Sequence, residues 1–277
     1  MTATDWSDAY ANAAHIPNSQ DYPPRWQAQA QAWRDALCEQ GRAQLDVAYG
    51  GGERQAYDVF LPEGNTLGLA VFVHGGYWRA FDRRTWSHFA QGAVNRGWTV
   101  VMPSYTLAPQ TSIANITLEI AQAIEHAAAQ IAGPIVLSGH SAGGHLVTRM
   151  VCANSPLSSA TQARIQRVAS ISGVHDLRPL VWTDLNASLH LDETQAALES
   201  PLLLRPNTQA CITAWVGAAE RPAFVQQSEA LHLVWSMLGA NVHLHREASR
   251  HHFDVIDDLC QASSGLCEAW LGSTCGH

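Results

Sequence analysis

Ser141 lies in the motif Gly-His-Ser-Ala-Gly-Gly, which occupies residues 139–144 and joins two segments of different character. The apolar residues 134–138 precede the motif and predict a strand, whereas residues 145–150 have helical spacing. A Gly-x-Ser-x-Gly at such a junction predicts a nucleophile elbow, in which the serine hydroxyl is exposed on a strained turn. The motif therefore restricts the fold to one in which a buried strand leads directly into a helix.

The segment 69–76, Leu-Ala-Val-Phe-Val-His-Gly-Gly, predicts a second buried strand that ends in a His-Gly-Gly turn. A hydrolytic serine needs backbone N–H donors for the oxyanion that forms on its substrate, and glycines let the backbone approach closely enough. We expect these donors in the loop of Gly75, Gly76 and Tyr77, together with the N–H of Ala142, the residue after the serine. The two segments together predict a nucleophile and its oxyanion hole.

The rest of the chain alternates strands and helices. Strands are predicted at 69–74, 98–103, 134–138, 166–172, 211–217 and 241–247, after a hairpin formed by 44–49 and 55–61. The windows between them predict helices, most clearly at 113–131, where isoleucine and alanine recur every three or four residues. This pattern predicts the fold class α/β, with a mostly parallel central sheet and helices on both faces.

The 277 residues are expected to form a single domain, 1–277. Residues 1–42 predict an N-terminal helical arm, with a helix from 23 to 41 that begins at Pro-Pro and ends at a glycine. Residues 155–209 interrupt the alternation with several prolines and a short acidic helix. We expect this segment to form a small cap above the sheet.

The charge balance excludes some classes of partner. Lysine and arginine number 16 against 24 aspartates and glutamates, without a basic cluster, which argues against nucleic acid and anionic membranes. The first residues lack the features of a signal peptide, and no apolar run reaches the roughly 18–20 residues that span a membrane. The expected location is the cytoplasm and the expected partner a small-molecule substrate, with a homodimer as the candidate assembly.

Cysteine and histidine give no sign of a metal centre. The six cysteines, at 38, 152, 211, 260, 267 and 275, form no Cys-x-x-Cys pair and are expected to stay reduced. The 14 histidines include no His-Glu-x-x-His motif. We expect neither a metal nor an organic cofactor.

A serine hydroxyl needs a base to take its proton and an acid to orient that base. After an elbow of this kind the partners follow in the order serine, acid, histidine. The best base lies in residues 250–256, Arg-His-His-Phe-Asp-Val-Ile, on the loop after the last predicted strand. His251 and His252 are both candidates at this point.

For the acid, the predicted strand 212–217 runs into a loop that holds Glu220. Glu220 is therefore the first candidate. Asp176 follows the strand 166–172, and two aspartates lie close to the base in sequence, Asp254 and Asp257. A Gly-x-Ser-x-Gly occurs by chance, but here the His-Gly-Gly loop, an acidic loop and a late histidine all follow in the required order. The sequence thus predicts a serine hydrolase. His74 is expected to brace its loop, and His140 and His145 to pack or bond locally.

Four segments carry a family resemblance. They are His-Gly-Gly-Tyr-Trp at 74–78, Ser-Tyr-Thr-Leu-Ala-Pro at 104–109, the elbow with its following His-Leu at 139–146, and His-Phe-Asp at 252–254. Together they resemble the kynurenine formamidase (arylformamidase) branch of the α/β-hydrolases. The likeness extends over most of the chain, including the aromatic-rich arm, residues 171–177 and residues 217–228.

The resemblance implies Ser141 as nucleophile, His252 as base and Glu220 at the acid position. The family more commonly has aspartate there, and the Pro-Ala-Phe at 222–224 lacks an acidic residue often found between its proline and phenylalanine. The implied reaction is hydrolysis of N-formyl-L-kynurenine to L-kynurenine and formate, a step of tryptophan breakdown, without a cofactor.

Aromatic side chains complete the predicted site. Tyr77 and Trp78 would make a cramped acyl pocket suited to a formyl group, and Tyr105 and Trp182 are candidates to contact the aromatic leaving group. Each of them could instead be part of the core.

Other functions use the same machinery. An elbow identifies the nucleophile and not the bond broken, so a carboxylesterase or arylesterase acting on small acyl esters is an alternative, as is a xenobiotic amide hydrolase. A relative that binds a ligand without turnover is a further alternative, against which the intact Ser141, His252 and Gly76 count.

Overall fold

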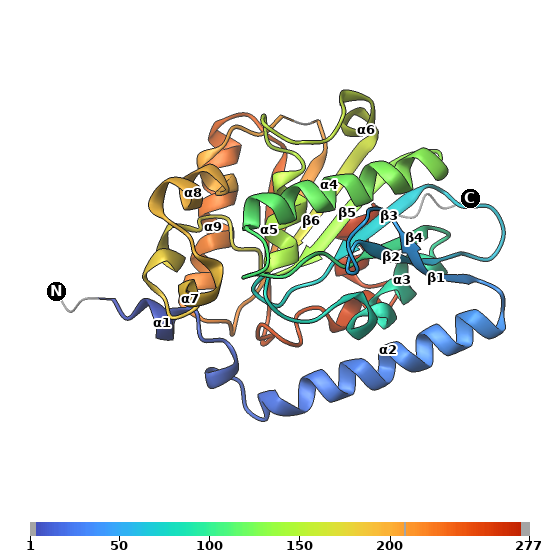
Figure 1. Cartoon of the computed structure of the whole chain (residues 1–277), viewed down its shortest axis with the longest axis horizontal. Helices are drawn as coiled ribbons and strands as arrows, with labels where there is room; N and C mark the ends of the chain where they lie inside the picture. Colours follow the sequence, from blue (N-terminus) through green and yellow to red (C-terminus); the bar gives the residue numbers. More distant parts are fainter. Residues whose placement is uncertain (1–3, 208, 273–277) are drawn as a thin grey trace.

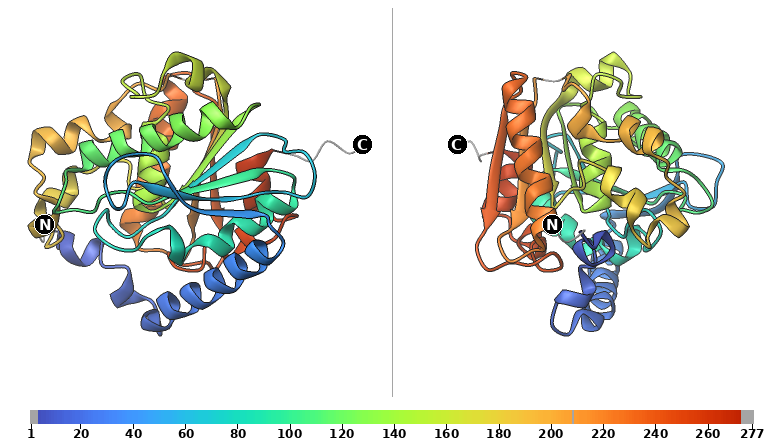
Figure 2. Two further views of the ribbon diagram at one scale, coloured as in Figure 1. Left: turned by 45° about the vertical axis from the view of Figure 1, so that its right-hand side comes forward. Right: turned by 90° about the vertical axis from the view of Figure 1, so that its left-hand side faces the viewer.

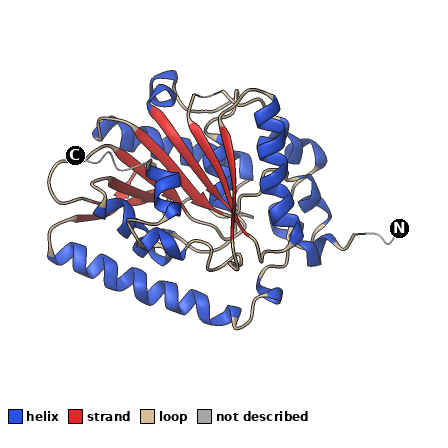
Figure 3. Ribbon diagram, turned by 180° about the vertical axis from the view of Figure 1, so that it is seen from behind, coloured by secondary structure: helices blue, strands red, loops and turns tan. Residues whose placement is uncertain are grey.

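A computed structural model describes residues 4–207 and 209–272 of the chain. Its centre is one eight-stranded sheet with the order β1-β2-β4-β3-β5-β6-β7-β8 (Figures 1 and 3). The strands are β1 (Ala43–Ala48), β2 (Ala56–Phe60), β3 (Leu69–Val73), β4 (Thr99–Pro103), β5 (Ile135–His140), β6 (Ile165–Ile171), β7 (Cys211–Gly217) and β8 (Val242–Glu247). The pairs β1–β2 and β2–β4 are antiparallel, and every other pair is parallel.

All eight strands lie where the sequence predicts them, within two residues at each end. The central strands β3, β4 and β5 are buried along their whole length because helices cover both faces of the sheet. The predicted α/β class and mostly parallel sheet are confirmed.

Successive residues of a strand point to opposite faces, and β3 shows how this divides the core. Val71 joins one apolar cluster, which also holds residues of α4, α5 and α9. Phe72 joins the other, with residues of α2, α3 and α10. The helices are α1 (Trp6–Ala9), α2 (Tyr22–Glu39), α3 (Gln91–Asn95), α4 (Ile113–Gln130), α5 (Ala142–Arg149), α6 (Ser159–Arg164), α7 (Asn186–Leu189), α8 (Glu193–Leu198), α9 (Pro222–Met237) and α10 (Gly265–Leu271).

The helix α4 is the one that the isoleucine spacing predicts. Ser112 caps it by accepting a hydrogen bond from the N–H of Asn115, and the stripe of isoleucines is buried against the sheet. The structure ends this helix at Gln130, one residue before the predicted end, because Ile131 is already extended.

The N-terminal arm lies along the outside of the domain, with α2 running the length of one edge (Figures 1 and 2). The predicted cap is narrower than 155–209, because β6 falls within that range and pairs with β5 and β7 in the sheet. The segment that leaves the sheet begins after Ile171 and carries α7 and α8.

Five cysteines are free in the described part of the chain: Cys38, Cys152, Cys211, Cys260 and Cys267. Cys275 lies outside the described residues. Among residues 4–207 and 209–272, no helix is both long and apolar enough to cross a bilayer.

Six histidines are buried among the described residues: His74, His88, His140, His145, His175 and His252. Loss of solvation lowers the pKa of His74 and His88 to about 4 from the usual 6.5. It lowers the pKa of His145 and His175 to about 3.

The buried histidines make stability depend on pH. As the pH falls below about 6.5, the histidines whose pKa burial lowers become protonated in the unfolded chain but stay neutral in the folded chain. The stability present at neutral pH is therefore progressively lost. Asp257, whose pKa burial raises to about 6, acts in the opposite direction, but it is one group against the five histidines whose pKa burial lowers. We expect the free energy of unfolding in urea to fall between about pH 6.5 and 4.5, by up to about 1.4 kcal/mol per histidine per pH unit. The free energy of unfolding should depend less steeply on pH in His88→Asn, and as steeply as in the native protein in the control His243→Asn. A flat profile would contradict this account.

Candidate active site

Ser141 occupies the turn between β5 and α5. Its φ of 56° and ψ of −115° are strained for a residue with a side chain, and its N–H donates to the carbonyl of Ile171 at 2.8 Å. A Cβ on Gly139 would collide with the backbone of Gly143, and one on Gly143 would collide with the carbonyl of Val73. The two glycines of the motif are thus required by the close approach of strand and helix. The elbow has the geometry that the sequence predicts.

His252 and Glu220 come together from two neighbouring loops. His252 lies on the loop after β8 and Glu220 on the loop after β7, and parallel strands bring both loops to the same edge of the sheet. The Nδ1 atom of His252 lies 2.6 Å from Oε2 of Glu220, and both side chains are buried. A carboxylate accepts the Nδ1–H of a histidine, which leaves Nε2 free as a base.

The rival acids have other partners. Asp254 accepts from the N–H of His251 at 2.7 Å, and Asp176 pairs with Arg178 at 2.7 Å. Asp257 lies 3.8 Å from Arg25. His251 has another partner, with its Nε2 at 3.0 Å from the hydroxyl of Tyr22, and it does not line the cavity that holds Ser141.

Ser172 is a part of this site that the sequence gives no reason to select. Its hydroxyl donates to Oε1 of Glu220, which also accepts the N–H of Gly217 at 2.8 Å. Ser172 adopts a positive φ of 50° directly after β6. The contact spans 48 residues of sequence, so only the adjacency of β6 and β7 could have indicated it.

His140 ties the elbow to the loop of the base. Its Nε2 lies 2.8 Å from the carbonyl of His252, so this ring nitrogen carries the hydrogen. Loss of solvation, followed by repulsion from His252, holds the pKa of His140 well below its usual value. A neutral His140 therefore joins two segments 112 residues apart, where the sequence predicts a local bond.

The loop after β3 supplies backbone donors. Among the described residues, the N–H groups of Gly76 and Tyr77 have no hydrogen-bond acceptor, and Ala142 opens α5, where an N–H has no partner in its own helix. The Nδ1 of His74 lies 2.7 Å from the carbonyl of Gly75. Because C=O and N–H of a trans peptide point in opposite directions, this bond fixes the direction of the Gly76 N–H. His74 thus braces the loop, as predicted.

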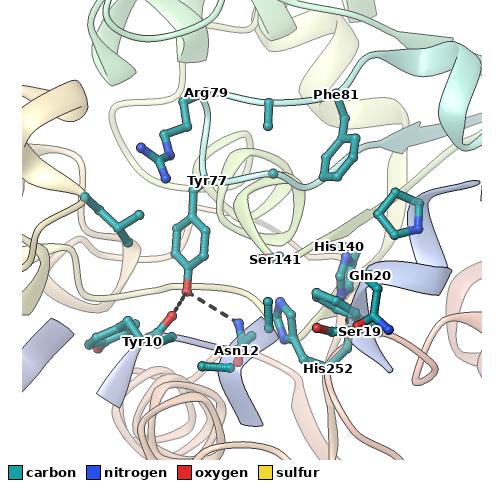
Figure 4. Close-up of a pocket in the computed structure, with 18 of the residues that line it drawn as sticks. Tyr10, Asn12, Ser19, Gln20, Tyr77, Arg79, Phe81, His140, Ser141 and His252 are labelled. Atoms are coloured by element: carbon teal, nitrogen blue, oxygen red, sulfur yellow. Dashed lines mark hydrogen bonds between the residues drawn. The ribbon is translucent and has the colours of Figure 1, made fainter. Parts of the chain in front are cut away.

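A cavity of about 830 Å³ opens over Ser141 (Figure 4). Ser141, His140 and His252 line it, together with Gly76 and Tyr77 of the loop after β3. Aromatic side chains form much of the wall: Trp26, Phe81, Trp86 and Phe253. No hydrogen bond joins Ser141 Oγ to His252 within the described residues, and such bonds often tighten only when substrate binds.

The N-terminal arm closes one side of the cavity. Tyr10 and Asn12 line it, and the hydroxyl of Tyr77 donates to the carbonyl of Tyr10 at 2.6 Å. Figure 4 shows Tyr77 reaching across to these two residues. An ion pair between Arg221 and Asp8 fastens the arm to the start of α9.

Three aromatic residues predicted to contact substrate do not line this cavity. Trp78 is fully buried, with its ring centroid 5.1 Å from that of His145. Tyr105 is equally buried and stacks on His74 at 4.4 Å. Trp182 is 65% exposed and is not among the lining residues, although its neighbours Thr183, Asp184 and Leu185 line the cavity. Trp78 and Tyr105 are therefore part of the core, which is the alternative that the sequence left open for them.

Comparison with known proteins identifies the family. Residues 70–254 match the profile of the alpha/beta hydrolase fold, and the chain belongs to that family. It is a hydrolase, and the matched range includes the elbow, the His-Gly-Gly loop, Glu220 and His252.

Within the family, the chain is similar to kynurenine formamidases. It is 29% identical to that of Danio rerio over 225 residues, which are 78% of this chain and 76% of the other. It is 29% identical to that of Salmo salar over 238 residues, 82% and 80% of the two chains. The resemblance that the sequence predicts is thereby confirmed.

A solved structure from Silicibacter sp. TM1040, provisionally described as a thioesterase, superposes with a TM-score of 0.91. It is 48% identical to this chain and covers 97% of it, and the match takes in 99% of the other chain.

Gly76 offers a test of the oxyanion loop. Its φ is +113°, and an added Cβ would meet the carbonyl of Ala80 and lie 2.8 Å from the ring of Phe81. Gly76→Ala must therefore shift the loop and misplace the N–H donors. We expect kcat to fall by about 10²–10³. In the matched control Gly239→Ala, φ is +85° but the added Cβ meets open space. Equal activity in the two variants would contradict the role of the loop.

Proposed function

We propose that this hydrolase is an arylformamidase that converts N-formyl-L-kynurenine to L-kynurenine and formate, with Ser141 as nucleophile, His252 as base and Glu220 as acid. The proposed catalytic triad is supported by one observation, the 2.6 Å contact between His252 and Glu220 beside the elbow serine. The substrate is supported by the similarity to kynurenine formamidases over about four-fifths of the chain.

In the first half of the reaction, Ser141 Oγ attacks the formyl carbon while Nε2 of His252 takes its proton. Glu220 holds the Nδ1–H of His252 and stabilises the imidazolium that forms. The oxyanion then accepts hydrogen bonds from the N–H groups of Gly76, Tyr77 and Ala142.

In the second half, the C–N bond breaks and His252 returns the proton to the departing aryl nitrogen. Kynurenine leaves a formyl ester on Ser141. His252 then removes a proton from water, which attacks this ester, and formate departs as the proton returns to Oγ. The scheme balances with water alone as co-reactant.

The shape of the cavity suits this substrate. Trp26, Phe81, Trp86 and Phe253 offer apolar faces for the aromatic ring of the leaving group. Five free cysteines in the described residues support our proposal of a cytoplasmic location, because the cytosol keeps thiols reduced.

An ester or thioester hydrolase is the second candidate. The Silicibacter protein that is 48% identical to this chain is provisionally described as a thioesterase, and the same acyl-enzyme chemistry cleaves esters. Relative turnover of formamide and ester separates the two candidates.

The test is steady-state hydrolysis of N-formyl-L-kynurenine, followed by the absorbance of released kynurenine, beside p-nitrophenyl acetate and an acyl thioester. We expect kcat/KM on the formamide above about 10⁴ M⁻¹s⁻¹, which is usual for a natural substrate. Ser141→Ala should abolish it. Ser19→Ala, which removes another serine hydroxyl from the same cavity, is the matched control. Turnover of the ester or thioester with negligible formamide turnover would move the protein to the second candidate.

A further inference from the structure

The cavity over Ser141 is apolar at its centre but charged at two points of its rim. Arg79 is the one arginine or lysine, and Asp184 the one carboxylate, among the described residues that line it. They come from different parts of the chain, the loop after β3 and the segment before α7. A purely apolar substrate would leave both the Arg79 guanidinium and the Asp184 carboxylate without a partner.

Arg79 is held close to the oxyanion loop. The backbone N–H groups of Arg79 and Ala80 both donate to the carbonyl of Gly76 at 3.0 Å. A single tight turn therefore connects Arg79 to the backbone donors Gly76 and Tyr77. Figure 4 shows the Arg79 and Phe81 side chains extending from the same loop above Ser141.

The guanidinium of Arg79 is exposed and has a weak contact only. Its Nη1 lies 3.3 Å from the hydroxyl of Ser188, and no carboxylate among the described residues pairs with it. A guanidinium with five N–H donors therefore retains most of its capacity for a ligand.

Asp184 is also exposed and lines the same cavity. Its backbone N–H donates to the hydroxyl of Ser7 at 2.9 Å, which ties this segment to the N-terminal arm. Its carboxylate makes no ion pair or hydrogen bond within the described residues. The rim thus presents one free cation and one free anion beside the cavity that holds the nucleophile.

We propose that Arg79 and Asp184 bind the head group of an α-amino acid, with Arg79 on the carboxylate and Asp184 on the ammonium. A guanidinium binds a carboxylate through two parallel N–H···O bonds, and a carboxylate accepts from an ammonium. The aromatic ring of the substrate then lies against the apolar wall, and its acyl group reaches Ser141.

This inference rests on the proposed function and makes it more specific. N-formyl-L-kynurenine carries its α-amino acid group at the far end of the molecule from the formyl carbon. An enzyme for simple acyl esters has no such group to bind. The rim charges therefore distinguish an amino acid derivative from an uncharged aryl ester.

The experiment isolates the carboxylate by comparing N-formyl-L-kynurenine with its carboxamide, which keeps the ring, the formyl group and the ammonium. The ratio of kcat/KM for the acid to kcat/KM for the carboxamide should be about ten in the native enzyme. It should fall about tenfold in Arg79→Met, because a hydrogen bond to a charged group at an exposed site is lost. The loss should appear in KM, since the head group is bound equally in ground and transition states.

Matched variants control for charge and folding. Arg246→Met removes an arginine of the outer strand β8 that pairs with Glu229 of α9, and the ratio should keep its native value in this variant. Arg79→Lys retains the charge without the planar fork and should give an intermediate ratio. For Asp184→Asn, the corresponding ratio compares N-formylkynurenine with its analogue that lacks the α-amino group, and it should likewise fall.

A native ratio in Arg79→Met would overturn the inference. If the native enzyme does not hydrolyse N-formylkynurenine but does hydrolyse p-nitrophenyl acetate, the proposed function fails. The rim is then tested by itself with O-acetyl-L-tyrosine and O-acetyl-L-tyrosinamide. A preference for the acid that Arg79→Met removes would support amino acid recognition, and equal turnover of the pair would overturn it.

Discussion

The hydrogen bond between His252 and Glu220 is the contact on which the rest of the site depends. It buries a carboxylate, and a buried charge is tolerated only where its oxygens are fully bonded. Glu220 meets this condition with His252 on one oxygen and Ser172 and Gly217 on the other. Gly217 ends β7, and the other three residues follow the parallel strands β6, β7 and β8, so the order of the strands sets the position of the base. The longer side chain of glutamate is accommodated there without loss of the contact to the histidine.

Two further contacts hold the segments around Ser141 in place. The neutral ring of His140 bonds the backbone of His252, so the residue before the serine is anchored to the loop that carries the base. On the other side, His74 bonds the carbonyl of Gly75 and stacks on Tyr105. Two buried histidines that take no part in the proton transfers thus position the loop of His252 and the backbone donors of Gly76 and Tyr77.

The strands, the elbow and the position of Glu220 could be predicted from the sequence because each has a local signal. Apolar runs mark the buried strands, and the order of serine, acid and histidine follows the chain. The lining of the cavity has no such signal. Trp78 and Trp182 are the same residue type, yet Trp78 is buried in the core and Trp182 is exposed on the surface. Tertiary packing alone decides between the two environments. The arm is predicted as a helical segment, but its contact through Tyr10 arises from the hydroxyl of Tyr77, a residue 67 positions away.

The central claim is that Glu220 and His252 activate Ser141, and the most direct measurement is the rate at which a fluorophosphonate labels the enzyme, with the adduct mapped by mass spectrometry. The account predicts a single adduct on Ser141 and a rate that falls by about 10³–10⁴ in Glu220→Gln, where the histidine loses its orienting carboxylate. The control Glu229→Gln removes a surface carboxylate that pairs with Arg246 and should label at the native rate. Native-rate labelling of Glu220→Gln, or an adduct at another residue, would contradict the account.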